Sequence, residues 1–363
     1  MHVPDGFIDA PVSLAAGAVA ATSVAVALRG ARREHGGTSH ASSYGGDRTA
    51  PLAGLVAAFV FAVQMLNFPV AAGTSGHLLG GALAAILVGP WTGVLCISVV
   101  LLMQGVLFAD GGLTALGVNI SVMAVVTTVV AYAIFRPLVK LLPRRRPSVT
   151  AAAFVAALVS VPAAAAAFTL LYALGGTTDV PVGTVFTAMV GVHTLIGLGE
   201  AAITALTVGA VIAVRPDLVY GAQGLARPLE LRTPEGAVIE PVVSTAAPRS
   251  ARRIGAVGLV AALALAGFVS YYASTSPDGL EKVAHDKGID SKAEDHAAKD
   301  SPLADYQVED VGDERISGGL AGVIGVGATL AVGTGVFVVV RRRRAAEASR
   351  ASSASSGSSA ETA

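Results

Sequence analysis

The stretch TVFTAMVGVHTLIGLGEAAITALTVGAVIAV (residues 184–214) decides the class of fold, because it is apolar over more than the length that a membrane-crossing helix requires. A helix needs about 20 apolar residues to cross the hydrocarbon core of a bilayer. No water satisfies the backbone there, so a crossing segment must make its hydrogen bonds within itself. Similar stretches lie at residues 8–28, 51–72, 113–135 and 151–174.

The composition of the whole chain agrees with a membrane protein. Of its 363 residues, 53% are hydrophobic and 14% are charged, whereas ordinary soluble domains carry about 25% charged residues. The sequence therefore predicts an all-α fold, a polytopic bundle of about seven membrane spans followed by a two-span C-terminal module. The only cysteine, Cys96, cannot form a disulfide within the chain.

The distribution of positive charge predicts how the helices cross the membrane. Arg and Lys concentrate on the cytoplasmic side of membrane proteins. Here they cluster at 29–48, 136–146, 215–253 and 341–344. The first nine residues contain Asp5 and Asp9 but no Arg or Lys. We therefore expect a multi-pass protein of the plasma membrane with its N-terminus outside and its C-terminus in the cytoplasm.

One apolar region is interrupted. The sequence GPWTG (residues 89–93) divides residues 78–108, since Pro and Gly end helices. Residues 78–88 are short for a complete span, so they form either a tilted short helix or half of a re-entrant hairpin.

These patterns divide the chain into four parts. Residues 1–215 form the first membrane module, and the basic, proline-containing segment 216–252 forms a cytoplasmic linker. Residues 253–342 contain two spans that flank an acidic loop, which we expect to be external and solvated. The Ser- and Ala-rich tail, residues 343–363, is of low complexity and is expected to be disordered.

The first two residues are candidate metal ligands. The α-amine of Met1, the backbone nitrogen of His2 and the His2 imidazole can enclose one ion in chelate rings of five and six members. A planar set of nitrogens suits Ni(II) or Cu(II), and low-spin cobalt is also compatible. The site requires an uncleaved N-terminus, and the positive start of a signal peptide is missing. The alternative is an ordinary polar N-terminus.

His77 is the candidate fourth ligand. It follows the small residues GTSG (residues 73–76) at the membrane face where the N-terminus is expected. Small residues there allow another segment to approach closely. The alternative is a histidine that only marks the membrane boundary.

A further histidine and a carboxylate lie on one predicted helix. His193 and Glu200 are seven residues apart, about 10 Å along the axis, so they cannot both bind one ion without a break in the helix. A carboxylate within a membrane helix is costly and needs a partner. We therefore favour a structural or coupling role over metal binding.

Other polar residues are assigned simpler roles. Asp110 and Asn119 resemble capping and loop-anchoring groups. His285 and His296 lie in the acidic loop, where solvation is favoured over a defined metal site.

Two other functions remain as alternatives. GTSG matches the G-x-S-G of rhomboid-type intramembrane serine proteases, in which Ser75 and His193 would form the catalytic dyad. Glu200 could instead carry protons in a metal–proton antiporter. The chain has no G-x-x-x-x-G-K-[ST] phosphate loop, so we do not expect it to hydrolyse ATP. We expect neither an enzyme nor a resident cofactor, and the Arg clusters are explained by topology rather than by nucleic-acid binding.

Two sets of residues resemble known families. MHVPDGF (residues 1–7), GTSGHL (residues 73–78) and the segment 110–120 are similar to the cobalt/nickel substrate-binding membrane components of energy-coupling-factor importers, the CbiM/NikM type, over about residues 1–215. PDGLE (residues 277–281), called the PDGLE segment below, resembles the PDGLE domain over about residues 250–342. The loop at 29–50 resembles a local insertion.

The resemblance implies a ligand set and partners. The family holds its metal in a plane of four nitrogens, which here correspond to the Met1 amine, the His2 amide and imidazole, and His77. Its partners are a transmembrane coupling protein and two cytoplasmic ATPases. The transported ligand is Ni²⁺ or Co²⁺, and the sequence does not separate the two.

Overall fold

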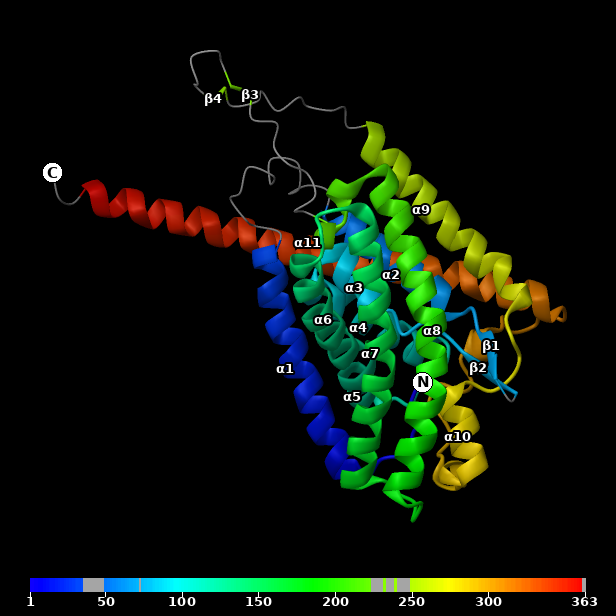
Figure 1. The fold of residues 1–363 in the computed structure, drawn as a ribbon. Coiled ribbons are helices and arrows are strands. Elements are labelled where there is room, and N and C mark those ends of the chain that lie inside the picture. Colours follow the sequence, from blue (N-terminus) through cyan, green and yellow to red (C-terminus); the bar gives the residue numbers. More distant parts are fainter. Residues whose placement is uncertain (35–48, 72, 223–230, 233–237, 240–248, 361–363) are drawn as a thin grey trace.

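In the computed structural model, the apolar stretches of the sequence form long helices that pack side by side (Figure 1). The structure describes residues 1–34, 49–71, 73–222, 231–232, 238–239 and 249–360. The helices of the first module are α1 (Ala10–Glu34), α2 (Thr49–Gln64), α3 (Gly81–Val88), α4 (Pro90–Leu107), α5 (Leu116–Asn119), η2 (Ile120–Val126), α6 (Thr127–Leu141), α7 (Arg146–Gly175) and α8 (Val182–Val214).

The remaining helices and the strands are few. The C-terminal helices are α9 (Arg249–Gly267), α10 (Gly279–Lys287) and α11 (Glu314–Ala360). The strands form two hairpins, β1 (Phe68–Ala71) with β2 (Thr74–Gly76) and β3 (Leu231–Arg232) with β4 (Val238–Ile239). Short 3₁₀ turns connect several of the helices.

The predicted fold class is confirmed. Within the described residues, seven helical segments are long and apolar enough to cross a membrane, and two of them lie in the C-terminal module. α2 is a shorter apolar helix. α9 and α11 pack against α2 and against each other, so the C-terminal module lies alongside the first (Figure 1).

The prediction of one span over residues 51–72 is wrong in its last third. α2 ends at Gln64, and Phe68–Ala71 pairs antiparallel with Thr74–Gly76. Pro69 has no N–H to continue a helix, and Gly73 adopts a φ of 72° at the turn between the strands. The resulting hairpin leads the chain directly into His77.

The predicted interruption after residue 88 is confirmed, and the structure shows what it produces. α3 ends at Val88, Gly89 has a φ of 96°, and Pro90 starts α4. The eight residues of α3 are all buried and rise about 12 Å, whereas the hydrocarbon core is about 30 Å thick. α3 is therefore too short to cross the core alone. It ends beside Glu34, the last residue of α1, which accepts from the backbone N–H of Trp91 at 3.0 Å. This position, at the opposite end of α1 from Ile8, agrees with the short-helix alternative.

Segments that the charge pattern assigns to the outer side lie at one end of the bundle. Ile8 forms a β-bridge with Gly176, and the backbone N–H of Ser274 donates to the carbonyl oxygen of Asn67. α10 packs against α8 at the same end (Figure 1). The acidic loop is thus folded onto the first module, while most of its charged side chains remain exposed.

α11 continues beyond its apolar part to Ala360, through the Ser- and Ala-rich tail for which the sequence pattern predicts disorder. No proline interrupts the segment, so a helix can propagate from the span before it. Most of the expected insertion at 29–50 and of the linker at 216–252 lies outside the described residues.

Candidate metal centre

The amino terminus runs into the protein interior. Met1 is 2% exposed and Val3 is fully buried. Val3 donates to Asn119 Oδ1 at 2.7 Å, and Asn119 Nδ2 donates to the Val3 carbonyl oxygen at 3.1 Å. Gly112 also donates to that carbonyl at 2.9 Å. The backbone of Val3 is therefore hydrogen-bonded to both Asn119 and Gly112, as a strand is to its neighbours. Asn119 anchors the N-terminal segment and does not cap a helix.

A second anchor comes from Asp5. Its Oδ1 accepts hydrogen bonds from the backbone and the hydroxyl of Thr114, at 2.8 and 2.5 Å. A Cβ on Gly112 would stand 2.3 Å from the Asp5 nitrogen, so only glycine allows this approach. The motif MHVPDGF thereby positions its own first residue.

His77 is oriented by its neighbours along the chain. Its Nδ1 donates to the carbonyl oxygen of Leu78 at 3.0 Å, so Nε2 carries the lone pair. The two carboxylate oxygens of Glu200 accept from the backbone N–H groups of Leu79 and Gly80, at 2.6 and 3.1 Å. Glu200 on α8 therefore fixes the segment that carries His77, which agrees with the structural role predicted for it.

The structure brings Met1, His2 and His77 together. The Met1 nitrogen lies 2.6 Å from His77 Nε2. The imidazole rings of His2 and His77 are stacked, with centroids 5.1 Å apart and an interplanar angle of 17°. Two neighbouring nitrogens on one ion with bonds of about 2.0 Å stand about 2.8 Å apart, so the Met1–His77 pair has nearly that spacing.

The His2 ring faces two polar side chains. Its Nε2 lies 3.1 Å from Gln104 Oε1, and its Nδ1 lies 3.1 Å from Asp110 Oδ1. Burial lowers the pKa of His2 to about 4, although Asp110 opposes the shift. The ring is therefore neutral near pH 7, as a metal ligand must be. To close a chelate with the amine, Nδ1 has to leave Asp110.

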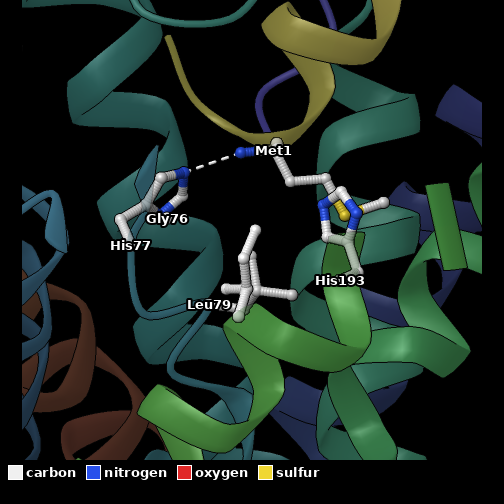
Figure 2. Close-up of a pocket in the computed structure, with 7 residues that line it drawn as sticks. Met1, Gly76, His77, Leu79 and His193 are labelled. Carbon is white, nitrogen blue, oxygen red and sulfur yellow. Dashed lines mark hydrogen bonds between the residues drawn. The ribbon is translucent and has the colours of Figure 1, made fainter. Parts of the chain in front are cut away.

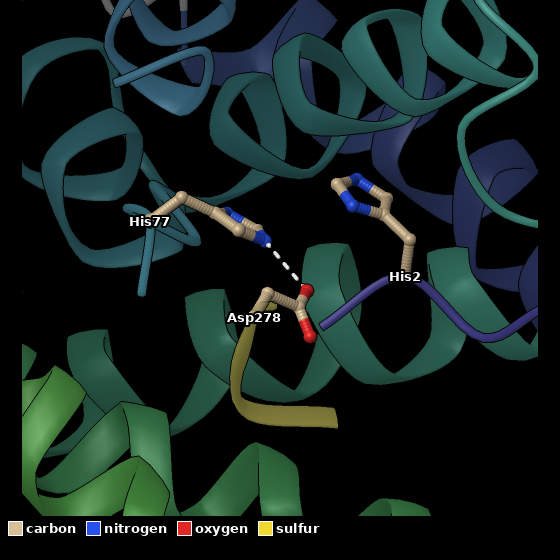
Figure 3. A group of neighbouring side chains, drawn as sticks. All are labelled: His2, His77 and Asp278. Carbon is tan, nitrogen blue, oxygen red and sulfur yellow. Dashed lines mark ion pairs between the residues drawn. The ribbon is translucent and has the colours of Figure 1, made fainter. Parts of the chain in front are cut away.

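A fourth group at the centre was not predicted from the sequence. Asp278 Oδ2 lies 2.5 Å from the Met1 nitrogen. It lies 3.5 Å from His77 Nε2, and Figure 3 shows this pair beside His2. One ligand atom each of His2, His77 and Asp278 lie within 4.8 Å of one another. Burial alone would raise the pKa of Asp278, but the Met1 ammonium and His77 hold it well below its usual value. The centre thus contains an anionic carboxylate from the C-terminal module.

Asp278 had a signal in the sequence. Asp followed three residues later by Glu is the pattern of a helix capping box, and both residues belong to the PDGLE segment. The pattern predicts a helix start, but it does not predict that this start lies beside Met1.

Of the other candidate residues, His193 lies close to Met1 and His77, whereas His285 is exposed in the acidic loop. A small pocket is lined by Met1, His77 and His193 (Figure 2). His193 Nδ1 lies 2.8 Å from the Met189 carbonyl oxygen. In the acidic loop, the exposed His285 pairs with Asp290.

The proposed protease dyad has no support in the geometry. Ser75 Oγ donates to the carbonyl oxygens of Ser276 and Pro277, at 2.7 and 3.2 Å. No hydrogen bond joins it to His193 in the described part of the chain. Ser75 therefore serves as a docking point for the C-terminal module.

A bundle of apolar helices that buries its own amino terminus beside a histidine defines the class, a polytopic membrane protein with a polar centre at one end. The model of the cobalt uptake substrate-specific transmembrane region matches residues 2–218, and the model of the PDGLE domain matches residues 252–342. The chain belongs to the cobalt uptake substrate-specific transmembrane region family and carries a PDGLE domain.

The comparisons also give individual proteins that this chain resembles. The chain is 39% identical over 220 residues to a putative metal transport protein of Haloquadratum walsbyi, covering 61% of this chain and 94% of that protein. It is 37% identical over 219 residues to a putative fused nickel transport protein NikMN of Archaeoglobus fulgidus, covering 60% and 68%. A crystal structure of a truncated transition metal transporter aligns with a TM-score of 0.49 and 28% identity, covering 59% of this chain and 99% of that one.

Proposed function

We propose that this protein is the substrate-capture membrane subunit of an ATP-driven energy-coupling-factor importer for Ni²⁺ or Co²⁺. The observation that carries the proposal is the buried Met1 nitrogen at 2.6 Å from His77 Nε2, beside the His2 ring. An amine, a backbone amide and two imidazoles form a nitrogen set that suits these ions. Relatives are named as nickel or cobalt transport proteins.

The proposed binding step rearranges His2. The Met1 ammonium and the His2 amide would each release a proton to solvent. The resulting amine and amide nitrogens and the His2 imidazole would enclose the ion, and His77 Nε2 would complete the plane. His77 is already oriented by the Leu78 carbonyl, so it enters with little reorganisation. His2 Nδ1 exchanges Asp110 for the ion. The remaining hydrogen bonds of Val3 and Asp5 hold the terminus in the bundle while this happens.

The proposed assembly divides capture from energy supply. Residues 1–215 form the capture module, 216–252 a cytoplasmic linker and 253–342 the PDGLE-like module, with the N-terminus outside. A transmembrane coupling protein and two cytoplasmic ATPases supply the energy, since the chain has no phosphate loop of its own.

The proposal is tested by extending the N-terminus. An uncleavable Gly-Ser dipeptide before Met1 converts the amine into a peptide nitrogen and adds bulk at a residue that is 2% exposed. We expect calorimetry to show complete loss of nickel and cobalt binding, while circular dichroism shows unchanged helix content.

Two controls accompany the extension. The same dipeptide placed after Ala363 should leave binding unchanged, and an extension that a protease removes should restore binding on cleavage. Unchanged metal affinity in the uncleaved, extended protein would contradict the proposed function.

A further inference from the structure

The PDGLE segment is docked on the candidate metal centre through several of its residues. Ser75 N–H donates to the Pro277 carbonyl oxygen at 2.9 Å. A Cβ on Gly279 would stand 2.7 Å from Ile196 Cδ1, so the absence of a side chain lets the backbone lie against α8. Leu280 is 1% exposed. The PDGLE segment therefore packs against α8 and binds the backbone at Ser75, two residues before His77.

The same segment fixes the direction of the Asp278 carboxylate. Asp278 Oδ1 accepts from the backbone N–H groups of Leu280 and Glu281, at 2.7 and 2.9 Å. The Glu281 carboxylate accepts from the Asp278 N–H at 2.8 Å, which completes a capping box at the start of α10. One carboxylate oxygen is thus held by the helix, and Oδ2 points at the Met1 nitrogen.

The distances at Oδ2 match a shared cation. Oδ2 lies 2.5 Å from the Met1 nitrogen and 3.5 Å from His77 Nε2, and those two nitrogens are 2.6 Å apart. Ligand atoms on one ion with bonds of about 2.0 Å stand about 2.8 Å apart as neighbours and about 4 Å apart on opposite sides. Two of the three pairs here are slightly closer than neighbouring ligands and one is wider, so the three atoms can surround one ion after small shifts. A plane of four nitrogens leaves positions above and below the ion, where a carboxylate from another module can bind.

The rest of the acidic loop also contacts the residues around the candidate metal centre. Glu294 N–H donates to the Asp5 carbonyl oxygen at 3.0 Å. Tyr306 donates its hydroxyl to Asp110 Oδ2 at 2.6 Å, and the other oxygen of Asp110 faces His2. The loop therefore contacts both the segment that carries Met1 and the side chain that faces His2.

We infer that Asp278 is a fifth ligand of the transported ion, an oxygen donor that the PDGLE segment delivers to the nitrogen site of the first module. The inference rests on the proposed function, because it adds a ligand to the same site. It assigns the C-terminal module a direct part in metal binding. The carboxylate faces the Met1 ammonium in the structure, and in the loaded protein it faces the ion.

The test uses Asp278→Asn in the full-length, N-terminally untagged protein. Asn caps a helix as well as Asp does, so α10 remains docked while the anionic oxygen is lost. We expect nickel affinity measured by calorimetry to fall about tenfold or more, as it does when groups that support a metal are removed. X-ray absorption at the nickel edge should lose one oxygen neighbour, from five ligands to four.

Two further variants separate the ligand from the cap and from general charge. Asp278→Ala removes both the ligand and the cap, and it should weaken binding at least as much as Asp278→Asn. Asp295→Asn removes a carboxylate that is paired with Lys299 in the same loop, and it should leave affinity unchanged.

The outcomes distinguish the two proposals. If Asp278→Asn binds nickel as tightly as the wild type or more tightly, with the same number of ligands, the carboxylate is only a counter-charge and the inference is wrong, while the nitrogen site stands. If the wild type binds no metal, or binds it equally with a blocked amine, the proposed function fails and the inference fails with it.

Discussion

Two buried carboxylates contact the segment that carries His77, and they differ in how their oxygens are used. Glu200 on α8 accepts one backbone N–H on each oxygen, from Leu79 and Gly80. Asp278 at the start of α10 accepts two backbone N–H groups on a single oxygen. The second oxygen of Asp278 faces the Met1 nitrogen.

The difference teaches how to separate a positioning carboxylate from one that is available to a cation. A carboxylate whose oxygens are both held by backbone donors is part of the scaffold, however deeply it is buried. A carboxylate with one oxygen held by the backbone and the other facing a charged or ligand-type nitrogen is oriented and still able to bind a cation. Glu200 therefore belongs to the support of His77, and Asp278 belongs to the centre.

The largest effect that would sharpen this comparison is on stability at Glu200. Glu200→Ala leaves two buried N–H groups without an acceptor, at about 1–3 kcal/mol for each. We expect a clearly lower unfolding temperature in detergent, with Glu200→Gln intermediate because its carbonyl oxygen still accepts. Asp278→Asn should unfold close to the wild type. Equal unfolding temperatures for Glu200→Ala and the wild type would contradict the structural role assigned to Glu200.

The next effect concerns the two histidines. His77 sits on the segment that Glu200 holds, whereas His2 closes a chelate with the amine of its own chain. Linked donors bind more strongly than separate ones, so His2→Ala should weaken nickel binding at least about tenfold more than His77→Ala. Calorimetry on both variants measures the ratio. If His77→Ala lost more nickel affinity than His2→Ala, His77 would contribute more to binding than the chelate formed by the first two residues.

The smallest expected effect concerns the orientation of the protein in the membrane, which decides the side that the candidate metal centre faces. Asp179 is exposed in the connection between α7 and α8, which meets the N-terminal segment at Gly176. Asp179→Cys should react with a membrane-impermeant maleimide in intact cells. Leu142→Cys, exposed after α6, should react only after permeabilisation. The native Cys96 is buried and should not contribute. Protection of the cysteine at 179 would reverse the orientation.

Much of the fold could be read from local patterns. The long apolar runs predict membrane helices because the bilayer leaves the backbone no other partner, and Gly89 with Pro90 marks the break between α3 and α4. The end of α2 at Gln64 was missed, because residues 68–71 are as apolar as the helix before them. Their pairing with β2 is a contact between segments, which composition does not encode.

The candidate centre divides in the same way. Met1, His2 and His77 were found because chelate geometry and small neighbouring residues are local properties. Asp110 and Asn119 were predicted to be capping and loop-anchoring groups. Asn119 does anchor the backbone of Val3, but the position of Asp110 beside His2 was not predicted. Both are ordinary polar residues whose partners lie more than a hundred positions away in the chain.

The sequence by itself determined that this protein is a helical membrane protein with a nitrogen-rich amino terminus, since hydrophobic length and the chemistry of the first two residues are properties of short stretches. Only the tertiary structure decided that Asp278 meets Met1 across 277 positions of sequence. An acidic loop has the composition of a solvated segment wherever it lies. The physical reason is that the environment of a carboxylate is set by the groups that fold around it.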